Sequence, residues 1–134
     1  MLIFIGLQAQ AKIWRVNNNP SLSADVLQAP ILFDNTNNAT NPEAAAGDTV
    51  YFEPSATTYN GITVNKANIL ILGYGYFLNE NTGLQANANN SKITTIFFDP
   101  PSAGSSISGM EIKSTCYFHK IGRASCRERV CYPV

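Results

Sequence analysis

Short runs of β-branched and aromatic residues recur along the middle of this chain, separated by glycine, asparagine, proline and serine. Such runs are typical of strands, because branched and aromatic side chains suit a pleated, half-buried backbone. A short alternating segment over residues 12–16, which carries Trp14, predicts a first strand. The runs that follow predict further strands over residues 49–52, 62–64, 69–72, 93–98 and 107–112.

Two short helical segments are expected before the second of these strands. Ser23 suits the N-cap of a helix over residues 23–29, which Pro30 ends. A second turn is predicted over residues 43–46, and Gly47 is expected to end it in the left-handed conformation. The hydrophobic pattern therefore changes from a helical to a strand-like period at this glycine.

The spacing of the strands indicates how they are arranged. Val50 and Ile69 are nineteen positions apart, and Ile69 and Ile93 are twenty-four apart. A recurrence in the twenties with very short strands is typical of a solenoid, in which each coil stacks on the next. An antiparallel sandwich, whose strands recur every 8 to 12 residues, stays open as an alternative because several gaps are that short.

Four runs carry a family resemblance: AAGDTVYF at 45–52, YNGITVNK at 59–66, NILILGYG at 68–75 and SISGMEI at 106–112. Together they resemble the first coils of the right-handed parallel β-helix superfamily, which includes the pectate-lyase-like proteins. The resemblance covers residues 44–113. It implies an all-β, right-handed parallel β-helix with a short capping helix at its N-terminal end. These motifs specify coils and cap, and they imply no particular chemistry.

Composition and charge narrow the classes of function. The chain has 134 residues, of which 45% are hydrophobic and 13% are charged, so it has enough apolar side chains for one packed domain. Its formal net charge is zero. Because nucleic-acid binding relies on a basic field, no nucleic-acid partner is expected.

Both ends of the chain differ from its body. Residues 1–7 are apolar, and Ala9 and Ala11 form a small-x-small cleavage pattern, which predicts a truncated signal peptide and a secreted or cell-surface protein. A buried first strand is the alternative. Seven apolar residues are too few to span a bilayer, so no membrane span is expected. Residues 121–131 resemble the translation of a sequencing-library adapter.

The predicted organisation follows from these boundaries. We expect a truncated signal peptide at 1–11, an N-terminal strand and cap region at 12–47, the first coils at 48–119 and a non-native tail at 120–134.

The candidate binding residues are aromatic. Tyrosine combines a flat apolar ring, which can stack on a sugar, with a hydroxyl that stays hydrated. The possible glycan contacts are Tyr51, Tyr59, Tyr74 and Tyr76. The alternative is that some of them pack under the cap and others are merely exposed.

The candidate catalytic and metal-binding residues give a weaker signal. The acidic residues that might act as acid, base or calcium ligand are Asp48, Glu53, Asp99 and Glu111. Their spacing requires neither role, and Asp48 fits better as a turn residue bonded to local backbone. The set Cys116, His119, Cys126 and Cys131 matches no zinc spacing. We therefore expect no catalytic residue, no metal and no cofactor.

Two classes of function remain open. The first is an N-terminal fragment of an exported, non-catalytic β-helix surface or adhesion protein, with polysaccharide or a cell-surface glycan as candidate partner. The second is a fragment of a polysaccharide lyase or glycoside hydrolase whose catalytic coils are missing. In either case we expect the fragment to be inactive as an enzyme and to self-associate through its open end, because unpaired strand edges favour association.

Overall fold

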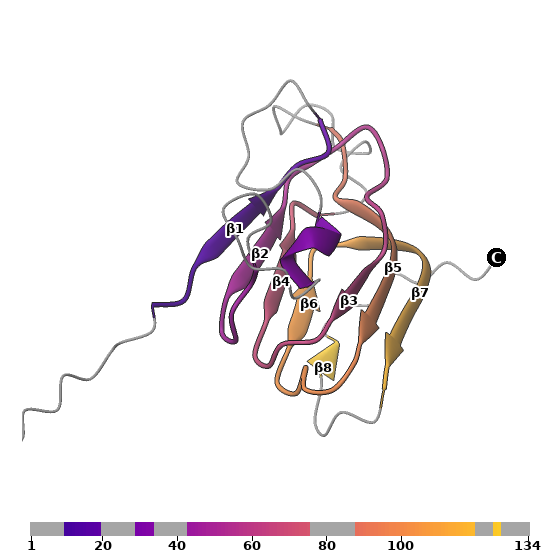
Figure 1. The fold of residues 1–134 in the computed structure, drawn as a ribbon. Helices are drawn as coiled ribbons and strands as arrows, with labels where there is room; N and C mark the ends of the chain where they lie inside the picture. Colours follow the sequence, from indigo (N-terminus) through magenta and orange to yellow (C-terminus); the bar gives the residue numbers. More distant parts are fainter. Residues whose placement is uncertain (1–9, 20–28, 34–42, 76–87, 120–124, 127–134) are drawn as a thin grey trace, which may run out of the picture.

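A computed structural model describes residues 10–19, 29–33, 43–75, 88–119 and 125–126, which form two parallel β-sheets (Figure 1). Sheet A has the strand order β1-β2-β4-β6-β8, and sheet B has the order β3-β5-β7. The elements are β1 (Ile13–Val16), the 3-10 helix η1 (Ala29–Phe33), β2 (Thr49–Phe52), β3 (Ile62–Val64), β4 (Leu70–Gly73), β5 (Lys92–Phe98), β6 (Ser106–Ser108), β7 (Glu111–Phe118) and β8 (Ser125–Cys126).

From β2 onward, the chain alternates between the two sheets, so each strand of sheet B lies in the sequence between two strands of sheet A. Parallel neighbours require such crossover connections, since a hairpin would reverse the strand direction. Every strand pairing found among the described residues is parallel. The antiparallel sandwich is therefore ruled out, and the all-β prediction is confirmed.

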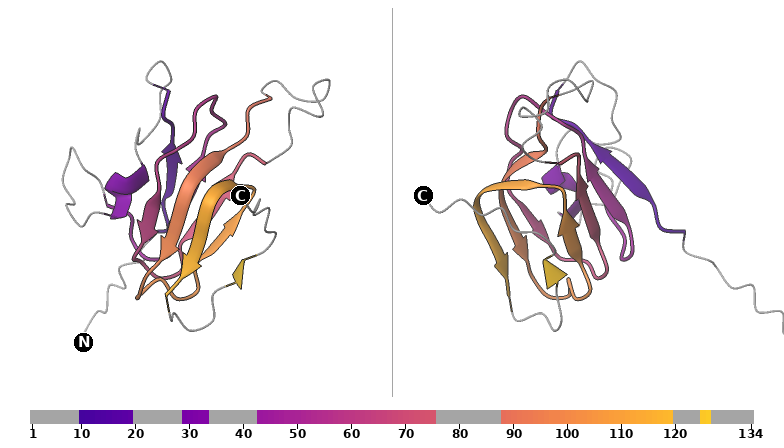
Figure 2. Two further views of the ribbon diagram at one scale, coloured as in Figure 1. Left: turned by 90° about the vertical axis from the view of Figure 1, so that its right-hand side faces the viewer. Right: turned by 180° about the vertical axis from the view of Figure 1, so that it is seen from behind.

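One hydrophobic core lies between the sheets. In β2, Val50 and Phe52 are buried while Thr49 and Tyr51 are partly exposed, as expected when alternate side chains point to opposite faces. The register stacks Val50 on Ile71 and Ile71 on Ile107. Buried residues of sheet B, such as Ile62, Ile96 and Phe98, belong to the same core. Figure 2 shows the two sheets facing each other across it.

The predicted coil spacing was wrong in detail. Val50 pairs with Ile71, which is 21 positions later, rather than with Ile69. Ile93 lies in β5 of sheet B and pairs with Ile112, so it does not continue the row of Val50. The sequence pattern had combined strands of two different sheets into one series, because both sheets supply similar aliphatic side chains to the shared core.

The prediction of one strand over residues 107–112 was also wrong. This segment is divided between β6 and β7, and Gly109 lies between them with a φ of 67°. A Cβ at Gly109 would lie 2.6 Å from the carbonyl oxygen of Gly73. The glycine therefore permits both the left-handed turn and the close approach that send the chain from sheet A to sheet B.

The helical expectations were not met where the structure describes them. Residues 20–28 lie outside the described residues, and Pro30 is the second residue of the 3-10 helix η1, where its missing N–H costs nothing. Residues 43–46 form no helix. Gly47 does have a positive φ, of 90°, as predicted.

The N-terminal region nevertheless packs onto the strands. The backbone N–H of Ala44 donates to the carbonyl oxygen of Leu32 at 2.9 Å, and the Asn65 amide donates to that of Phe33 at 2.9 Å. Leu32 and Ala44 are buried. In the described part of the chain, η1 therefore packs into the shared hydrophobic core through Leu32 and Phe33.

The predicted terminal segments lie mostly outside the described residues. Residues 1–9 of the predicted signal peptide are among these, as are residues 120–124 and 127–134 of the predicted tail. Ser125–Cys126 forms β8, which pairs with β6. Within the described residues, no helix is long and apolar enough to cross a membrane.

Candidate functional site

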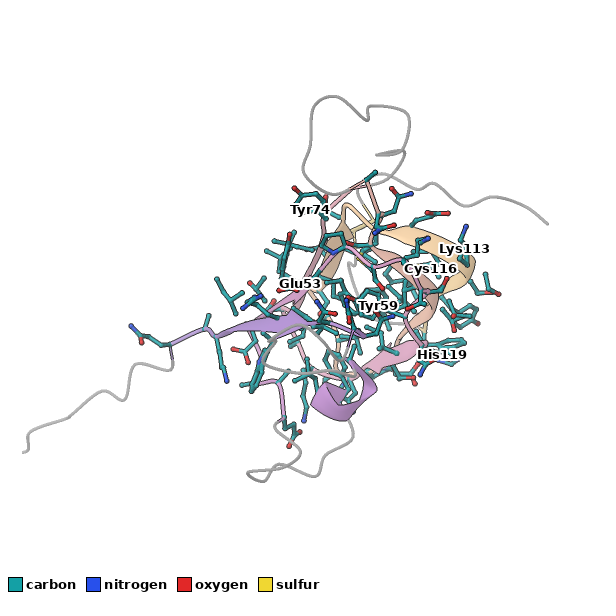
Figure 3. The ribbon with its side chains drawn as sticks, turned by 90° about the horizontal axis from the view of Figure 1, so that it is seen from above. Glu53, Tyr59, Tyr74, Lys113, Cys116 and His119 are labelled. Atoms are coloured by element: carbon teal, nitrogen blue, oxygen red, sulfur yellow. The ribbon has the colours of Figure 1, made fainter. Side chains whose placement is uncertain are left out.

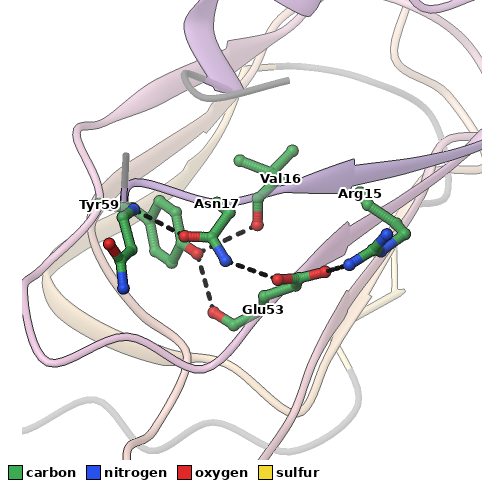
Figure 4. Close-up of polar contacts among 6 residues, drawn as sticks. Arg15, Val16, Asn17, Glu53 and Tyr59 are labelled. Atoms are coloured by element: carbon green, nitrogen blue, oxygen red, sulfur yellow. Dashed lines mark hydrogen bonds and ion pairs between the residues drawn. The ribbon is translucent and has the colours of Figure 1, made fainter. Parts of the chain in front are cut away.

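Tyr59, one of the predicted glycan contacts, is a buried structural residue, so this prediction was wrong. Only 2% of it is exposed. Its ring packs edge-on against Phe52 at a centroid distance of 5.0 Å. Its hydroxyl is the hydrogen-bond donor to two backbone carbonyl oxygens, that of Glu53 at 2.8 Å and that of Val16 at 3.0 Å (Figure 4). The hydroxyl therefore satisfies buried backbone, where a ligand cannot reach it.

This environment predicts an alkaline dependence of stability. Burial raises the pKa of Tyr59 from 10.0 to about 12. Between pH 10 and 12 the unfolded chain has released the Tyr59 proton and the folded chain keeps it. The contribution of this hydroxyl to the free energy of unfolding is therefore fully present below pH 10 and is lost as the pH rises to about 12. Tyr59→Phe is expected to be about 1–2 kcal/mol less stable at neutral pH, because it loses a buried hydrogen bond.

The gap in unfolding free energy between wild type and Tyr59→Phe should therefore narrow from pH 10 to 12, which urea unfolding across this range would measure. Tyr117→Phe, which alters an exposed tyrosine, serves as the control. A gap of constant size would contradict the assignment of this titration to Tyr59.

Beside Tyr59, the carboxylate of Glu53 is held at the C-terminal ends of β1 and β2. One oxygen is ion-paired with Arg15, and the other accepts from the amide of Asn17 at 2.5 Å (Figure 4). Asn17 is fully buried, and its own oxygen accepts from the backbone N–H of Asn19 at 2.6 Å. Because the carboxylate is bound from two sides, it has a defined position next to the outer face of sheet A.

Two of the predicted tyrosines lie on that outer face. Tyr51 pairs with Arg15 on one side and Leu72 on the other. Tyr74 follows Leu72 by two positions and is 43% exposed. Its backbone is held where the β4 strand ends, because its N–H donates to the hydroxyl of Ser91 at 2.7 Å. Tyr76, the fourth predicted contact, lies outside the described residues.

The electrostatics show that these groups share one neighbourhood. Partial burial raises the pKa of Tyr51, and the nearby Tyr74 and Glu53 raise it further, while Arg15 acts in the opposite direction. We call Arg15, Tyr51, Glu53 and Tyr74 the sheet A patch. Figure 3 shows Tyr74 and Glu53 on the same side of the molecule. The patch combines aromatic rings with a fixed ion pair at the surface.

The four acidic residues considered as catalytic candidates have separate partners. Asp48 is buried and accepts from the backbone N–H groups of Lys12 and Ala45 and from the indole of Trp14. Glu53 belongs to the sheet A patch, and Asp99 pairs with His119. The turn role predicted for Asp48 is thus confirmed and extends to strand β1.

Glu111, the fourth of these acids, is held by its own neighbours. Burial raises the pKa of Glu111, but the hydrogen bond from Asn90 and the adjacent Lys113 outweigh this and lower it overall. The Asn90 amide donates to the carboxylate at 2.9 Å.

In the part of the chain that the structure describes, no group of three or more His, Cys, Asp or Glu residues could hold a metal ion.

A second group of exposed aromatic residues, which was not predicted, lies on the outer face of sheet B. Phe97 is 37% exposed and Tyr117 is 47% exposed. The alternation within residues 93–98 could have revealed the first of them, because inward Ile96 and Phe98 require Phe97 to point outward. No local signal joined it to Tyr117, since the strand predicted over residues 107–112 ends before that tyrosine.

Comparisons of this chain with protein-family models, with curated proteins and with solved structures find no match. Its function is therefore inferred from the geometry of its own residues.

Proposed function

We propose that this chain forms coils of a right-handed parallel β-helix and binds polysaccharide through the sheet A patch. Three features support the fold: parallel pairing throughout the described strands, regular alternation between two sheets, and stacked aliphatic rows. Crossovers between parallel strands are right-handed in nearly all proteins, which supports the handedness. The resemblance of residues 44–113 to pectate-lyase-like proteins points to the same architecture.

The single observation that carries the binding proposal is the outward position of Tyr51 and Tyr74 beside the Arg15–Glu53 ion pair. A pyranose ring has an apolar face and a rim of hydroxyl groups. Aromatic rings suit the face, and charged donors and acceptors suit the hydroxyls, because hydrogen bonds to charged groups are stronger than neutral ones. The parallel strands hold these side chains in fixed positions, which reduces the entropy lost on binding.

Binding is proposed rather than cleavage. Glycosidases need a pair of carboxyl groups flanking one bond, whereas the carboxylates of Asp48, Asp99 and Glu111 each have their own structural partners. No contact among the described residues favours the alternative of a polysaccharide lyase or hydrolase. An exported surface or adhesion protein remains the setting that we propose for this activity.

Tyr74→Ala is expected to weaken polysaccharide binding by about ten- to a hundredfold, because covering an aromatic side chain contributes about 1.5–3 kcal/mol. Affinity electrophoresis of the purified chain in gels containing cellulose, xylan, mannan, pectin or chitosan derivatives measures this. Tyr51→Ala should weaken binding to the same polysaccharide.

Leu70→Ala is a matched control, because Leu70 is 36% exposed on the same sheet and lies outside the patch. It should bind as wild type does. Absence of retardation in every gel, or equal affinity of both tyrosine variants and wild type, would refute the proposed function.

A further inference from the structure

Phe97 and Tyr117 form an aromatic pair on the outer face of sheet B. The register of this sheet aligns Thr63 with Phe97 and Phe97 with Tyr117 on three successive strands. The two ring centroids lie 6.3 Å apart with planes inclined by 57°. Both rings are substantially exposed, so the pair presents apolar surface to solvent from a rigid parallel ladder.

A polar group borders this pair at the end of the sheet. The edge-on ring of His119 packs against Tyr117 at a centroid distance of 4.8 Å, and its Nδ1 lies 2.5 Å from the carboxylate of Asp99. The backbone of both residues is fixed, since the N–H of His119 donates to Phe98 and that of Asp99 donates to Val64. We call Phe97, Asp99, Tyr117 and His119 the sheet B platform.

The platform and the sheet A patch face in different directions. The inner faces of both sheets contribute to a single core, so their outer faces point away from each other. Figure 3 shows Tyr74 and Glu53 on one side of the molecule and His119 on the other. One sugar ring therefore cannot contact both surfaces.

The composition of the platform selects its ligand. Its apolar part consists of only two side chains, whereas a stable protein partner covers about 800 Å² of surface on each side. A carboxylate and an imidazole lie directly beside the rings, and Thr115 adds an exposed hydroxyl two positions before Tyr117. A small exposed aromatic area bordered by hydrogen-bonding groups suits the apolar face and the hydroxyl rim of a pyranose ring.

We propose that the sheet B platform is a second carbohydrate-binding surface and that the chain thereby bridges two polysaccharide strands. The platform takes the same class of ligand as the proposed function assigns to the sheet A patch, and it consists of different residues. Two sites on one rigid scaffold increase the retention of a polymer without any new contact at either site.

The test uses the full chain with Tyr74→Ala, which disables the sheet A patch, in the same polysaccharide gels. This variant should keep weak retardation through the platform. Adding Tyr117→Ala should reduce that remaining affinity by about tenfold or more, whereas adding Tyr117→Phe should change it by less than about twofold, because the ring is kept. Thr63→Ala, on the same row, is the matched control, and thermal melts confirm that each variant is folded.

Each outcome separates the two sites. If Tyr74→Ala alone removes all retardation, or if Tyr117→Ala changes nothing in that background, the platform proposal is overturned and the sheet A patch stands. If Tyr117→Ala alone removes binding and Tyr74→Ala has no effect, the platform stands and the proposed function of sheet A fails. If no polysaccharide retards the wild type, both fail.

Discussion

Replacing Asp48 with alanine is expected to lower the free energy of unfolding by about 3 kcal/mol or more, because hydrogen bonds to a charged acceptor contribute about 1.5–3 kcal/mol each. The carboxylate accepts from Trp14 Nε1 and the Lys12 N–H at 2.8 Å and from the Ala45 N–H at 2.9 Å. Asp48 is 3% exposed and Trp14 is 6% exposed. Truncation would leave the indole N–H buried without its acceptor and detach β1 from the turn before β2.

Urea unfolding of Asp48→Ala, Trp14→Phe and the double variant would measure this effect and assign it. The two single substitutions should be non-additive, since they remove the same hydrogen bond. Asp48→Asn should be intermediate, because its amide keeps one acceptor oxygen. A loss below about 1 kcal/mol for Asp48→Ala would contradict the anchoring role.

Gly73→Ala is expected to destabilise the fold by about 3 kcal/mol, since overpacking against backbone cannot be relieved by a change of rotamer. A Cβ at this position would overlap the carbonyl oxygen of Gly109 and lie 2.8 Å from its carbonyl carbon. It would also lie 2.5 Å from the sulfur of Met110. The substitution would therefore push apart β4 and the turn that leads from β6 to β7.

Gly47→Ala is the matched control for this effect. Gly47 has a φ of 90°, but a Cβ there would meet no atom within 4 Å. Its cost should be only the strain of a left-handed residue, about 1–2 kcal/mol. Thermal or denaturant unfolding should rank Gly73→Ala as the more destabilising change, and the reverse order would be inconsistent with the close approach of Gly73 and Gly109.

Local patterning predicted the strands well because strand formation depends on short-range alternation. The predicted limits of residues 49–52 and 62–64 coincide with β2 and β3, and residues 93–98 differ from β5 by one residue. The segment at 107–112 failed because its apolar residues serve two sheets. Which sheet receives a strand depends on pairing with residues 19 to 36 positions away, as Ile107 shows by pairing with Ile71.

The candidate site was predicted only in part. Tyr51 and Tyr74 lie at the surface as expected, and the same residue type at Tyr59 is buried. No local signal separates these tyrosines. One of the two carbonyl oxygens that accept from the buried Tyr59 hydroxyl belongs to Val16, 43 positions earlier in the chain. Glu53 was considered only as a possible acid, base or calcium ligand, because its pairing with Arg15 depends on β1 lying beside β2.

The sequence by itself determined that this chain is all-β, where most strands lie, and that Gly47 and Asp48 form a turn, because alternation and turn chemistry act over a few residues. The tertiary structure decided the assignment of strands to two sheets, the burial of Tyr59 and the exposure of Phe97 beside Tyr117. These features depend on parallel pairing across crossovers, whose partners are distant in sequence and are selected by packing of the shared core.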